Sequence, residues 1–360
     1  MFKKLLELLH KIQLIFLEFN FMNPKVLLIY TGGTIGMIKS HKDESLQPFN
    51  FHNLINNIPE LKLLNCSIDI ISFEEPIDSS NISIKNWVEI ADIVESYYHT
   101  CDGFVILHGT DTMSYSASAL SFMLENLNKP IIFTGSQLPI GHLRTDAKEN
   151  LITSIQIASL QKDNNPLIQE VGLYFEYRLF RGNRTTKINA DHFEAFSSIN
   201  FPPLISSGVK LQIQYDLLVK NNPLKKLKVH RVMSESIVLI KLFPGIQELT
   251  LASILQTPGL EGVVLETFGS GNAPTSDWFL NLIKDSILRG IYVVNVTQCS
   301  GGMVYMGQYE TSQKLSEMGV ISAYNMTTEA AVTKMMHLLG SRDFLNFKQS
   351  FESSLRGEMC

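Results

Sequence analysis

A threonine follows two adjacent glycines where the first apolar run of the chain ends. The run KVLLIY (25–30) leads directly into TGGTIG (31–36). Gly32 and Gly33 can turn the chain sharply at the carboxyl end of a strand, which is where open α/β sheets bind ligands. The segment lacks the GxxxxGK[ST] of a P-loop and the GxGxxG of a dinucleotide site. Thr34 is therefore a capping residue of a tight turn, or a reactive hydroxyl that projects into a crevice.

A second group of hydroxyls follows the strand-like run GFVIL (103–107). HGTDTM (108–113) places the carboxylate of Asp111 between Thr110 and Thr112. One of these side chains would be enough to cap the helix expected next. The excess of polar groups favours a reactive site, because a threonine hydroxyl is a weak nucleophile that needs an adjacent base.

Two further polar segments follow apolar runs. RGNRTTK (181–187) ends in Lys187, whose amine can act as a base when its site is partly desolvated. EPIDSSN (75–81) supplies one acid and two hydroxyls, a composition typical of an ordinary turn when it stands alone. Together the four segments predict a threonine-based hydrolytic site with no metal-ligand set. His108 and His142 lie near these motifs but are not placed as triad bases, so we expect structural roles for both.

The composition limits the class of protein. The chain has 360 residues, of which 45% are hydrophobic and 18% charged, as in globular proteins of about two domains. A net charge of -5 disfavours non-specific binding to nucleic acid. The four cysteines form no CxxC pair and no zinc-like cluster, which disfavours a disulfide scaffold and favours a reducing compartment.

The first 21 residues stand apart from the rest. MFKKLLELLHKIQLIFLEFNF is apolar along one helical face, but charges interrupt it before it reaches a membrane span of ~20 apolar residues. No cleavage site of small residues follows it. We interpret residues 1–21 either as an artefact of the assigned start, with the natural start at Met22, or as an amphipathic helix.

Strand-like and helical patterns alternate along the chain, which predicts a doubly wound α/β fold. We expect strands over 25–30, 67–72, 103–107, 130–134, 171–177, 237–242, 262–267 and 291–296, and helices over 87–98, 113–127, 147–160, 277–289 and 329–339. The last helix has a threonine cap at 327 or 328, and Gly340 is expected to stop it.

Proline pairs and a basic run break this alternation between residues 197 and 236. We therefore expect an N-terminal domain over 22–200, a linker over 201–235 and a C-terminal domain over 236–360. The basic run KKLKVHR (225–231) is expected to be a solvated face of that linker.

The motifs together resemble the bacterial-type L-asparaginase family, and closely its cytoplasmic type I branch. The resemblance runs from about Lys25 to the C-terminus. It is carried by TGGTIGM (31–37), DSS (78–80), DGFVILHGTDTM (102–113), SALSFMLENL (118–127), TGSQLPI (134–140), RGNRTTK (181–187), GNAP (271–274), TQC (297–299) and LRGE (355–358).

The resemblance implies hydrolysis of L-asparagine to L-aspartate and ammonia without a cofactor or metal. Thr34 matches the nucleophile that forms an acyl-enzyme, and Thr110, Asp111 and Lys187 match a second polar triad. The residues that match substrate ligands are Asp78, Ser79, Ser80, Thr110 and Asp111. A zwitterionic substrate does need an anion for its ammonium and hydrogen-bond donors for its carboxylate, and cleavage of an amide needs oxyanion donors.

The resemblance also implies a larger N-terminal α/β domain with a mostly parallel sheet and a smaller flavodoxin-like C-terminal α/β domain. Its type I branch is cytoplasmic, and the family's sites lie between the subunits of a homodimer or homotetramer. The expected partners are therefore L-asparagine and further copies of the chain, with no nucleic acid and no membrane.

Two positions depart from the family pattern. Members often carry a tyrosine on the mobile loop after TGGTIG, and Leu46 falls about there in this chain. The group that activates Thr34 is then Tyr30, a glutamate of the loop, or Lys187 acting through Thr110.

The second departure concerns regulation. Some type I members have a second asparagine site that activates the enzyme, and Thr297, Gln298, Cys299 and Thr328 match parts of it. The arginine that would bind the effector carboxylate aligns with Glu266. This reversal of charge predicts that the effector site is lost or altered.

Three alternatives stay open. A dual asparaginase–glutaminase would also accept glutamine, whose side chain is one methylene longer than that of asparagine. One methylene changes the binding free energy by only ~1–3 kcal/mol. An amidotransferase subunit that releases ammonia for tRNA amidation would carry an added N-terminal domain, for which 21 extra residues are too few. A non-catalytic amino-acid sensor with the same fold would not need to keep a nucleophile and its base.

Overall fold

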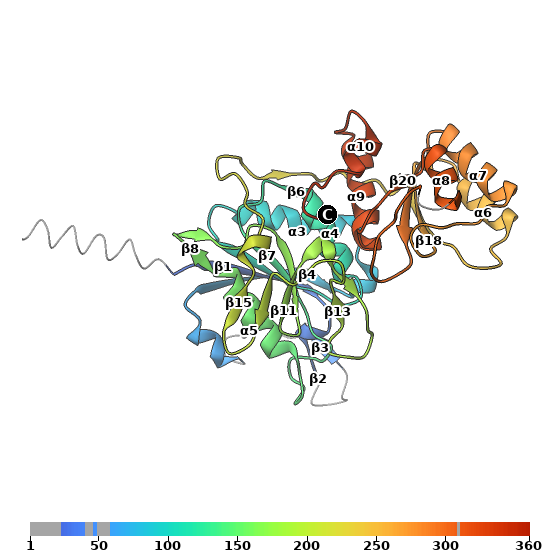
Figure 1. The fold of residues 1–360 in the computed structure, drawn as a ribbon. Helices are drawn as coiled ribbons and strands as arrows, with labels where there is room; N and C mark the ends of the chain where they lie inside the picture. Colours follow the sequence, from blue (N-terminus) through green and yellow to red (C-terminus); the bar gives the residue numbers. More distant parts are fainter. Residues whose placement is uncertain (1–22, 40–45, 49–57, 308–309) are drawn as a thin grey trace, which may run out of the picture.

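The computed structural model describes residues 23–39, 46–48, 58–307 and 310–360, which form two α/β domains (Figure 1). The expected fold class is confirmed, since a larger, mostly parallel sheet is followed by a separate, smaller parallel one. The extension 1–21 lies outside the described residues. None of the described helices is long and apolar enough to span a membrane.

The larger sheet has eight strands in the order β15-β14-β11-β10-β7-β5-β1-β4. The five strands from β4 to β10 are parallel, and in chain order they read 2-1-3-4-5, so the order reverses between β1 and β5. Three antiparallel strands complete the other edge. The bounds are β1 (Lys25–Gly32), β4 (Ser67–Ile77), β5 (Gly103–Leu107), β7 (Ile131–Thr134), β10 (Val171–Phe175), β11 (Arg178–Arg181), β14 (Ile205–Ser207) and β15 (Leu211–Ile213).

Helices cover both faces of this sheet. On β1, Leu27 and Ile29 join a core with α3 (Ile84–Tyr97) and α4 (Met113–Met123). Alternate residues of the same strand face a second core that contains α5 (Ala147–Ala158). Burial on both faces explains why the strands are continuous apolar runs instead of alternating ones.

The smaller sheet consists of four parallel strands in chain order: β17 (Ile237–Lys241), β18 (Gly262–Thr267), β19 (Tyr292–Thr297) and β20 (Ile321–Ser322). One face packs on α6 (Glu248–Leu255), α7 (Asp277–Leu288) and α8 (Glu310–Glu317). The other face packs on α9 (Thr328–Ser341) and α10 (Phe347–Phe351). Helix α9 also contacts α4, so it joins the two domains.

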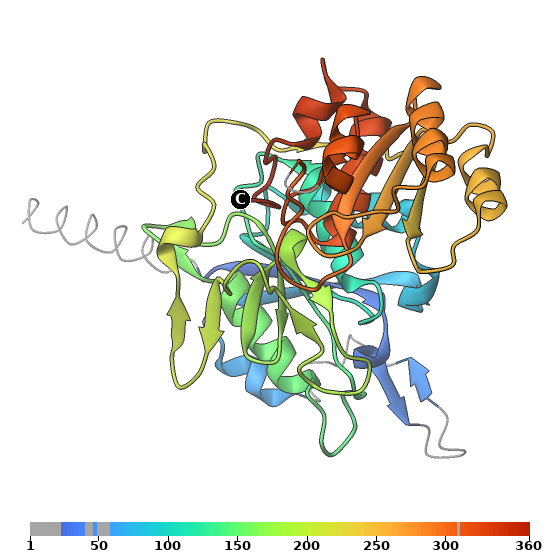
Figure 2. The same ribbon diagram turned by 45° about the vertical axis from the view of Figure 1, so that its right-hand side comes forward.

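Short strands and 3₁₀ helices occupy the connections. The strand pairs are β2 (Met37–Lys39) with β3 (Leu46–Pro48), β6 (Leu124–Glu125) with β16 (Lys228–Val229), β8 (Gln161–Lys162) with β9 (Asn165–Pro166), and β12 (Thr186–Lys187) with β13 (Phe196–Ser197). The 3₁₀ helices are η1 (Thr34–Gly36), η3 (Pro59–Leu63), η4 (Ser79–Asn81), η5 (Gly182–Arg184) and η6 (Tyr215–Leu217). In Figure 2 the β2–β3 hairpin projects from the end of β1, away from the smaller domain.

All eight expected strands and all five expected helices exist, with ends shifted by a few residues. The helix expected over 113–127 is shorter, because Leu124 and Glu125 pair with the chain at 228–229. The interpretation of 201–235 as a plain linker was too simple, because this stretch supplies β14, β15 and β16. The domain bounds themselves stay a prediction.

The basic run at 225–231 is only partly a solvated face. Its three lysines are exposed, as expected, but Leu227 and Val229 pack against the core beside α3. Arg231 forms ion pairs with Asp92 and Glu95 of α3. The run therefore attaches the connection to the larger domain.

The expectation that Gly340 stops the last helix was wrong. The helix continues to Ser341, and Arg342 ends it in the left-handed conformation with φ 54°. Gly340 serves close packing instead. A Cβ atom there would clash with the carbonyl of Val232 and lie 2.7 Å from the Cα of Met233.

We therefore expect Gly340→Ala to lower the free energy of unfolding by about 1–3 kcal/mol, although alanine is the better helix former by ~1 kcal/mol. Urea unfolding followed by circular dichroism measures this, with Ser341→Ala in the same helical turn as the control. A stabilised Gly340→Ala protein would contradict the close contact with Val232.

Candidate active site

The predicted site segments lie at the carboxyl ends of neighbouring strands. TGGT (31–34) spans the end of β1, HGTDT follows β5, and DSS (78–80) follows β4. The strand order reverses between β1 and β5, and open α/β sheets bind ligands at such a switch point. The larger sheet therefore places three of the four predicted segments at its ligand-binding edge.

Glycines let the three strand-end loops touch through their backbones. Gly32 (φ 137°) and Gly33 (φ 86°) have positive φ angles. A Cβ on Gly32 would clash with the carbonyl of Ile77, and one on Gly33 would lie 2.5 Å from the Cα of Gly109. A Cβ on Gly109 would in turn lie 2.5 Å from Ser79 Oγ. Any side chain at these positions would push the loops apart.

Side-chain hydroxyls tie the same loops together. Thr31 Oγ1 donates to the carbonyl of Leu107 at 3.0 Å, and Thr112 Oγ1 donates to the carbonyl of Ser79 at 2.7 Å. Thr112 is thus occupied in joining loops and has a structural role. Thr34, which begins η1, is partly exposed at the meeting point of the loops.

Lys187 joins the site from a different part of the fold. Its Nζ donates to Thr110 Oγ1 at 2.9 Å and to Asp111 Oδ1 at 2.7 Å. The side chain of Lys187 is 18% exposed, whereas that of Asp111 is 64% exposed. The structure therefore brings together the three residues of the predicted polar triad, and a face of Asp111 stays open to a ligand.

Gln137 completes this polar chain, and the sequence analysis assigned it no role. Thr110 Oγ1 donates to Gln137 Oε1 at 3.3 Å, while Gln137 Nε2 donates to the carbonyls of Ala190 and His192 at 2.8 and 3.0 Å. These carbonyls can only accept, which fixes the amide orientation. Gln137 follows strand β7, so the rule that located the other segments, polar residues at strand ends, points to it as well.

The remaining predicted substrate ligands lie on the loop after β4. Asp78 Oδ1 accepts from the backbone N–H and the hydroxyl of Ser80, both at 2.9 Å. The backbone bond, and then the hydroxyl bond, lower the pKa of Asp78, so its carboxylate stays charged in mildly acidic solution. Asp78 and Ser80 are exposed, whereas Ser79 is 4% exposed and packs against Gly109.

Of the three candidate activators of Thr34, Tyr30 is disfavoured. Its hydroxyl donates to the carbonyl of Gly36 at 3.4 Å, and burial raises its pKa to about 12. A phenol with that pKa is almost never ionised near neutrality, so Tyr30 supports the turn instead of acting as a base. The loop glutamate and the side chain of Leu46 lie outside the described residues.

His108 has the structural role expected for it. It is fully buried, with Nδ1 2.7 Å from the carbonyl of Gly109 and Nε2 2.9 Å from Ser116 Oγ. Trp87 Nε1 donates to the same Ser116 hydroxyl at 2.9 Å. The pattern assigns the proton to Nδ1 of a neutral ring, because a carbonyl only accepts. Burial lowers the pKa of His108 to about 4.

The residues predicted for an effector site also come together. A cavity of about 390 Å³ is lined by Glu266, Thr297, Gln298, Cys299 and Thr328, and also by Thr186 and Lys187. Thr328 Oγ1 donates to Glu266 Oε1 at 2.6 Å, and Lys241 Nζ lies 3.4 Å from Glu266 Oε2. The carboxylate of Glu266 therefore occupies the region where a cationic side chain was expected in the family.

Within the described residues, no group of three or more histidine, cysteine or acidic side chains could hold a metal ion. All four cysteines are free thiols.

Two family models match the chain: "Asparaginase, N-terminal" over residues 25–218 and "Glutaminase/Asparaginase C-terminal domain" over residues 236–349. L-asparaginase 1 of Escherichia coli (strain K12) is 40% identical over 336 residues, which cover 93% of this chain and 97% of that protein. The 60 kDa lysophospholipase of Mus musculus is 39% identical over 93% of this chain and 62% of its own length. The crystal structure of L-asparaginase I from Vibrio cholerae matches with a TM-score of 0.83 at 40% identity, over 94% of this chain and 99% of that one.

Because His108 is neutral and buried, we expect the folded protein to lose stability in acid. Its pKa falls from 6.5 to about 4 on folding, so between these values the unfolded chain binds more protons and stability falls as the pH falls. The loss amounts to about 3 kcal/mol once the pH is below both values. We expect the free energy of urea unfolding of His108→Gln to decline less steeply than that of wild type between pH 6.5 and 4. Parallel declines would contradict this role of His108.

Proposed function

Because this chain belongs to the asparaginase family, we propose that it hydrolyses L-asparagine to L-aspartate and ammonia through an acyl-enzyme on Thr34. The observation that carries the proposal is the position of Lys187 Nζ, within hydrogen-bond distance of both Thr110 and Asp111. Thr110 and Asp111 lie on the loop after β5, which is in direct contact with the TGGT turn at the switch point of the sheet.

In the proposed reaction, Thr34 Oγ1 attacks the side-chain amide carbon of asparagine. The bond from carbon to oxygen forms, the bond to nitrogen breaks, and the nitrogen leaves as ammonia after gaining the proton that Thr34 lost. We assign the relay of that proton to Lys187 and Thr110, which are hydrogen-bonded to each other. We also assign Thr110 to the position next to the attacked carbon, as the family resemblance implies. Water then cleaves the ester and restores the threonine.

Backbone N–H groups stabilise the charge that develops during attack. The turn at Gly33 and the loop before Thr110 are in close contact, and we assign the oxyanion hole for the amide oxygen to their backbone N–H groups. A preorganised site of this kind lowers the barrier because its dipoles need no rearrangement during the reaction.

Charges on the loops after β4 and β5 suit a zwitterionic substrate. One carboxylate oxygen of Asp111 accepts from Lys187, and we assign the other oxygen to the α-ammonium group of asparagine. Asp78 supplies further negative charge, because its lowered pKa keeps it ionised. The hydroxyls and N–H groups of Ser79 and Ser80 serve as donors to the α-carboxylate.

We further propose a cytoplasmic homodimer or homotetramer. The exposed faces of Asp78 and Asp111 leave the site open in a single chain, which suits a site that a second copy completes. Cytoplasmic location rests on the resemblance and on the free cysteines.

Ammonia release from L-asparagine and L-glutamine tests the reaction. We expect the wild-type protein to turn over asparagine. Thr34→Ala and Thr110→Ala should each lower the rate by about 1,000-fold or more, because the loss of one member of a catalytic unit removes most of the rate that the unit provides. Thr153→Ala is a matched control, since the hydroxyl of Thr153 bonds Glu149 within α5, away from the site. A folded wild-type protein that binds asparagine without turning it over would overturn the proposal in favour of an amino-acid sensor. Comparable turnover of glutamine would make the protein a dual asparaginase–glutaminase.

The effector cavity yields a separate prediction. Because Glu266 repels the carboxylate of a second asparagine, we expect the rate to depend hyperbolically on asparagine concentration, with no activation by added substrate. Rates measured from well below to well above the KM decide this. A sigmoidal curve that Cys299→Ala or Thr328→Ala makes hyperbolic would show that the effector site is intact.

A further inference from the structure

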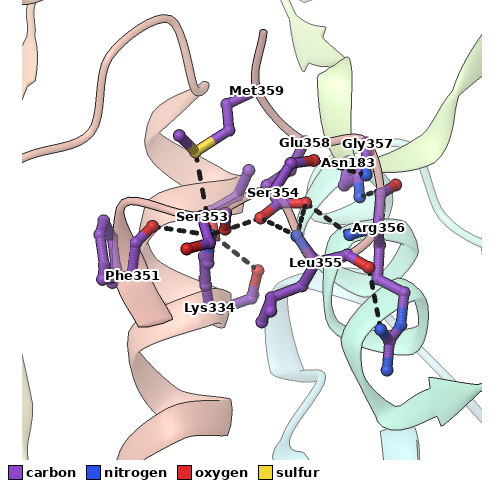
Figure 3. A network of polar contacts seen from close by, with 12 residues as sticks. Asn183, Lys334, Phe351, Ser353, Ser354, Leu355, Arg356, Gly357, Glu358 and Met359 are labelled. Carbon is purple, nitrogen blue, oxygen red and sulfur yellow. Dashed lines mark hydrogen bonds and ion pairs between the residues drawn. The ribbon is translucent and has the colours of Figure 1, made fainter. Parts of the chain in front are cut away.

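The C-terminal end of the chain packs against the segment that carries Lys187. After α10, residues 355–358 lie between helix α9 of the smaller domain and the 3₁₀ helix η5 of the larger one (Figure 3). Three side chains around η5 contact this tail: Arg181, Asn183 and Arg184. Each of them is 6% exposed or less. The contact is therefore part of the interior and not a surface association.

A buried ion pair fixes the shape of the tail. Lys334 of α9 and Glu358 are both 0% exposed, and they pair directly. Lys334 Nζ also donates to the carbonyls of Phe351 and Ser353 at 2.7 and 2.6 Å. The carboxylate of Glu358 accepts the N–H groups at 355 and 356, so the tail closes into a loop around the pair. Since both charges are fully paired, the loop has one well-defined arrangement.

This arrangement aims backbone carbonyls of the tail at η5. The carbonyl of Gly357 accepts from Arg184 Nε at 2.8 Å and from Arg181 Nη1 at 3.3 Å. The carbonyl of Arg356 accepts from Asn183 Nδ2 at 3.1 Å. All three donors belong to RGNRTTK, the motif that ends in Lys187.

Lys187 has little support from a β-sheet, although the neighbouring Thr186 Oγ1 donates to Glu329 Oε1 of α9 at 2.6 Å. Strand β12 consists of Thr186 and Lys187 alone, and among the residues that the structure describes it pairs only with the two-residue strand β13. The segment immediately before β12 is the one that the tail holds. A shift of about 1 Å in a reacting group can cost 100-fold in rate.

We propose that residues 355–358 are a positioning element for the reaction, which hold the RGNR segment and thereby keep Lys187 in contact with Thr110 and Asp111. The inference rests on the proposed function of Lys187. It gives the smaller domain a defined part in the chemistry, although this part of that domain supplies no group to the triad.

Gly357→Ala tests the inference most directly. Gly357 has φ 76°, and a Cβ there would clash with the guanidinium of Arg181. Gly290→Ala is the matched control, because Gly290 has φ 90° in the same domain with no atom within 4 Å of the added Cβ. Both variants carry the same backbone strain, but only Gly357→Ala disturbs the contact with η5.

Two readouts separate positioning from simple loss of folded protein. We expect kcat of Gly357→Ala to fall about 10- to 100-fold per folded protein with KM changed by less than threefold. We also expect an amine-specific reagent to label Lys187 several-fold faster than in wild type, measured by mass spectrometry. Labelling of half-buried Lys129, which donates to the carbonyls of Tyr98 and Cys101, should not change.

Arg184→Lys and Arg184→Gln form a second pair. Arg184→Lys keeps a charged donor for the Gly357 carbonyl and should therefore retain more of the wild-type kcat than Arg184→Gln. If folded Gly357→Ala and Arg184→Gln proteins keep wild-type kcat and Lys187 labelling, the inference is overturned. If wild type releases no ammonia, the proposed function fails, and the labelling rates still decide whether the tail positions Lys187.

Discussion

The site depends on three strand ends that meet so closely that no side chain fits between them. Gly32 lies against the backbone of Ile77, Gly33 against the backbone of Gly109, and Gly109 against the side chain of Ser79. Parallel strands bring their carboxyl ends to one edge of the sheet, and the reversal of strand order opens that edge. The glycines convert this general property of the fold into a contact between particular loops, and only then do the hydroxyls and carboxylates of those loops share one site.

The larger part of the fold could be predicted from sequence because it follows from local patterns. Strands buried on both faces must be apolar throughout, and the helices between them carry caps and apolar stripes. The site segments were also within reach, because polar residues that directly follow a buried strand are unusual enough to be noticed. Gln137 obeys the same rule after β7, but a single amide gives a weaker signal than Asp111 between two threonines.

The other features that sequence analysis missed depend on contacts between distant segments. Gly340 looks like a helix stop, yet it is needed because the backbone at Val232 crosses the helix at that point. The basic run at 225–231 looks solvated, yet its alternate residues pack on the core and its arginine pairs with α3. Residues 355–358 match the family pattern, but their contact with RGNRTTK joins positions more than 170 residues apart. No local pattern can specify such a contact.

These contacts suggest why a hydrolytic site of this kind needs two domains. The strand-end loops of the larger sheet can supply the nucleophile, its neighbouring hydroxyl and the acids, since each follows a parallel strand. Lys187 cannot arrive in that way, because it lies beyond the antiparallel strand β11, on a segment with only a two-residue strand of its own. Its amine must nevertheless stay within 3 Å of two partners. The buried pair of Lys334 and Glu358 provides a rigid support outside the sheet, and the Gly357 carbonyl transmits that rigidity to the segment. The smaller domain thus holds the segment of Lys187 in place, which the larger sheet cannot do.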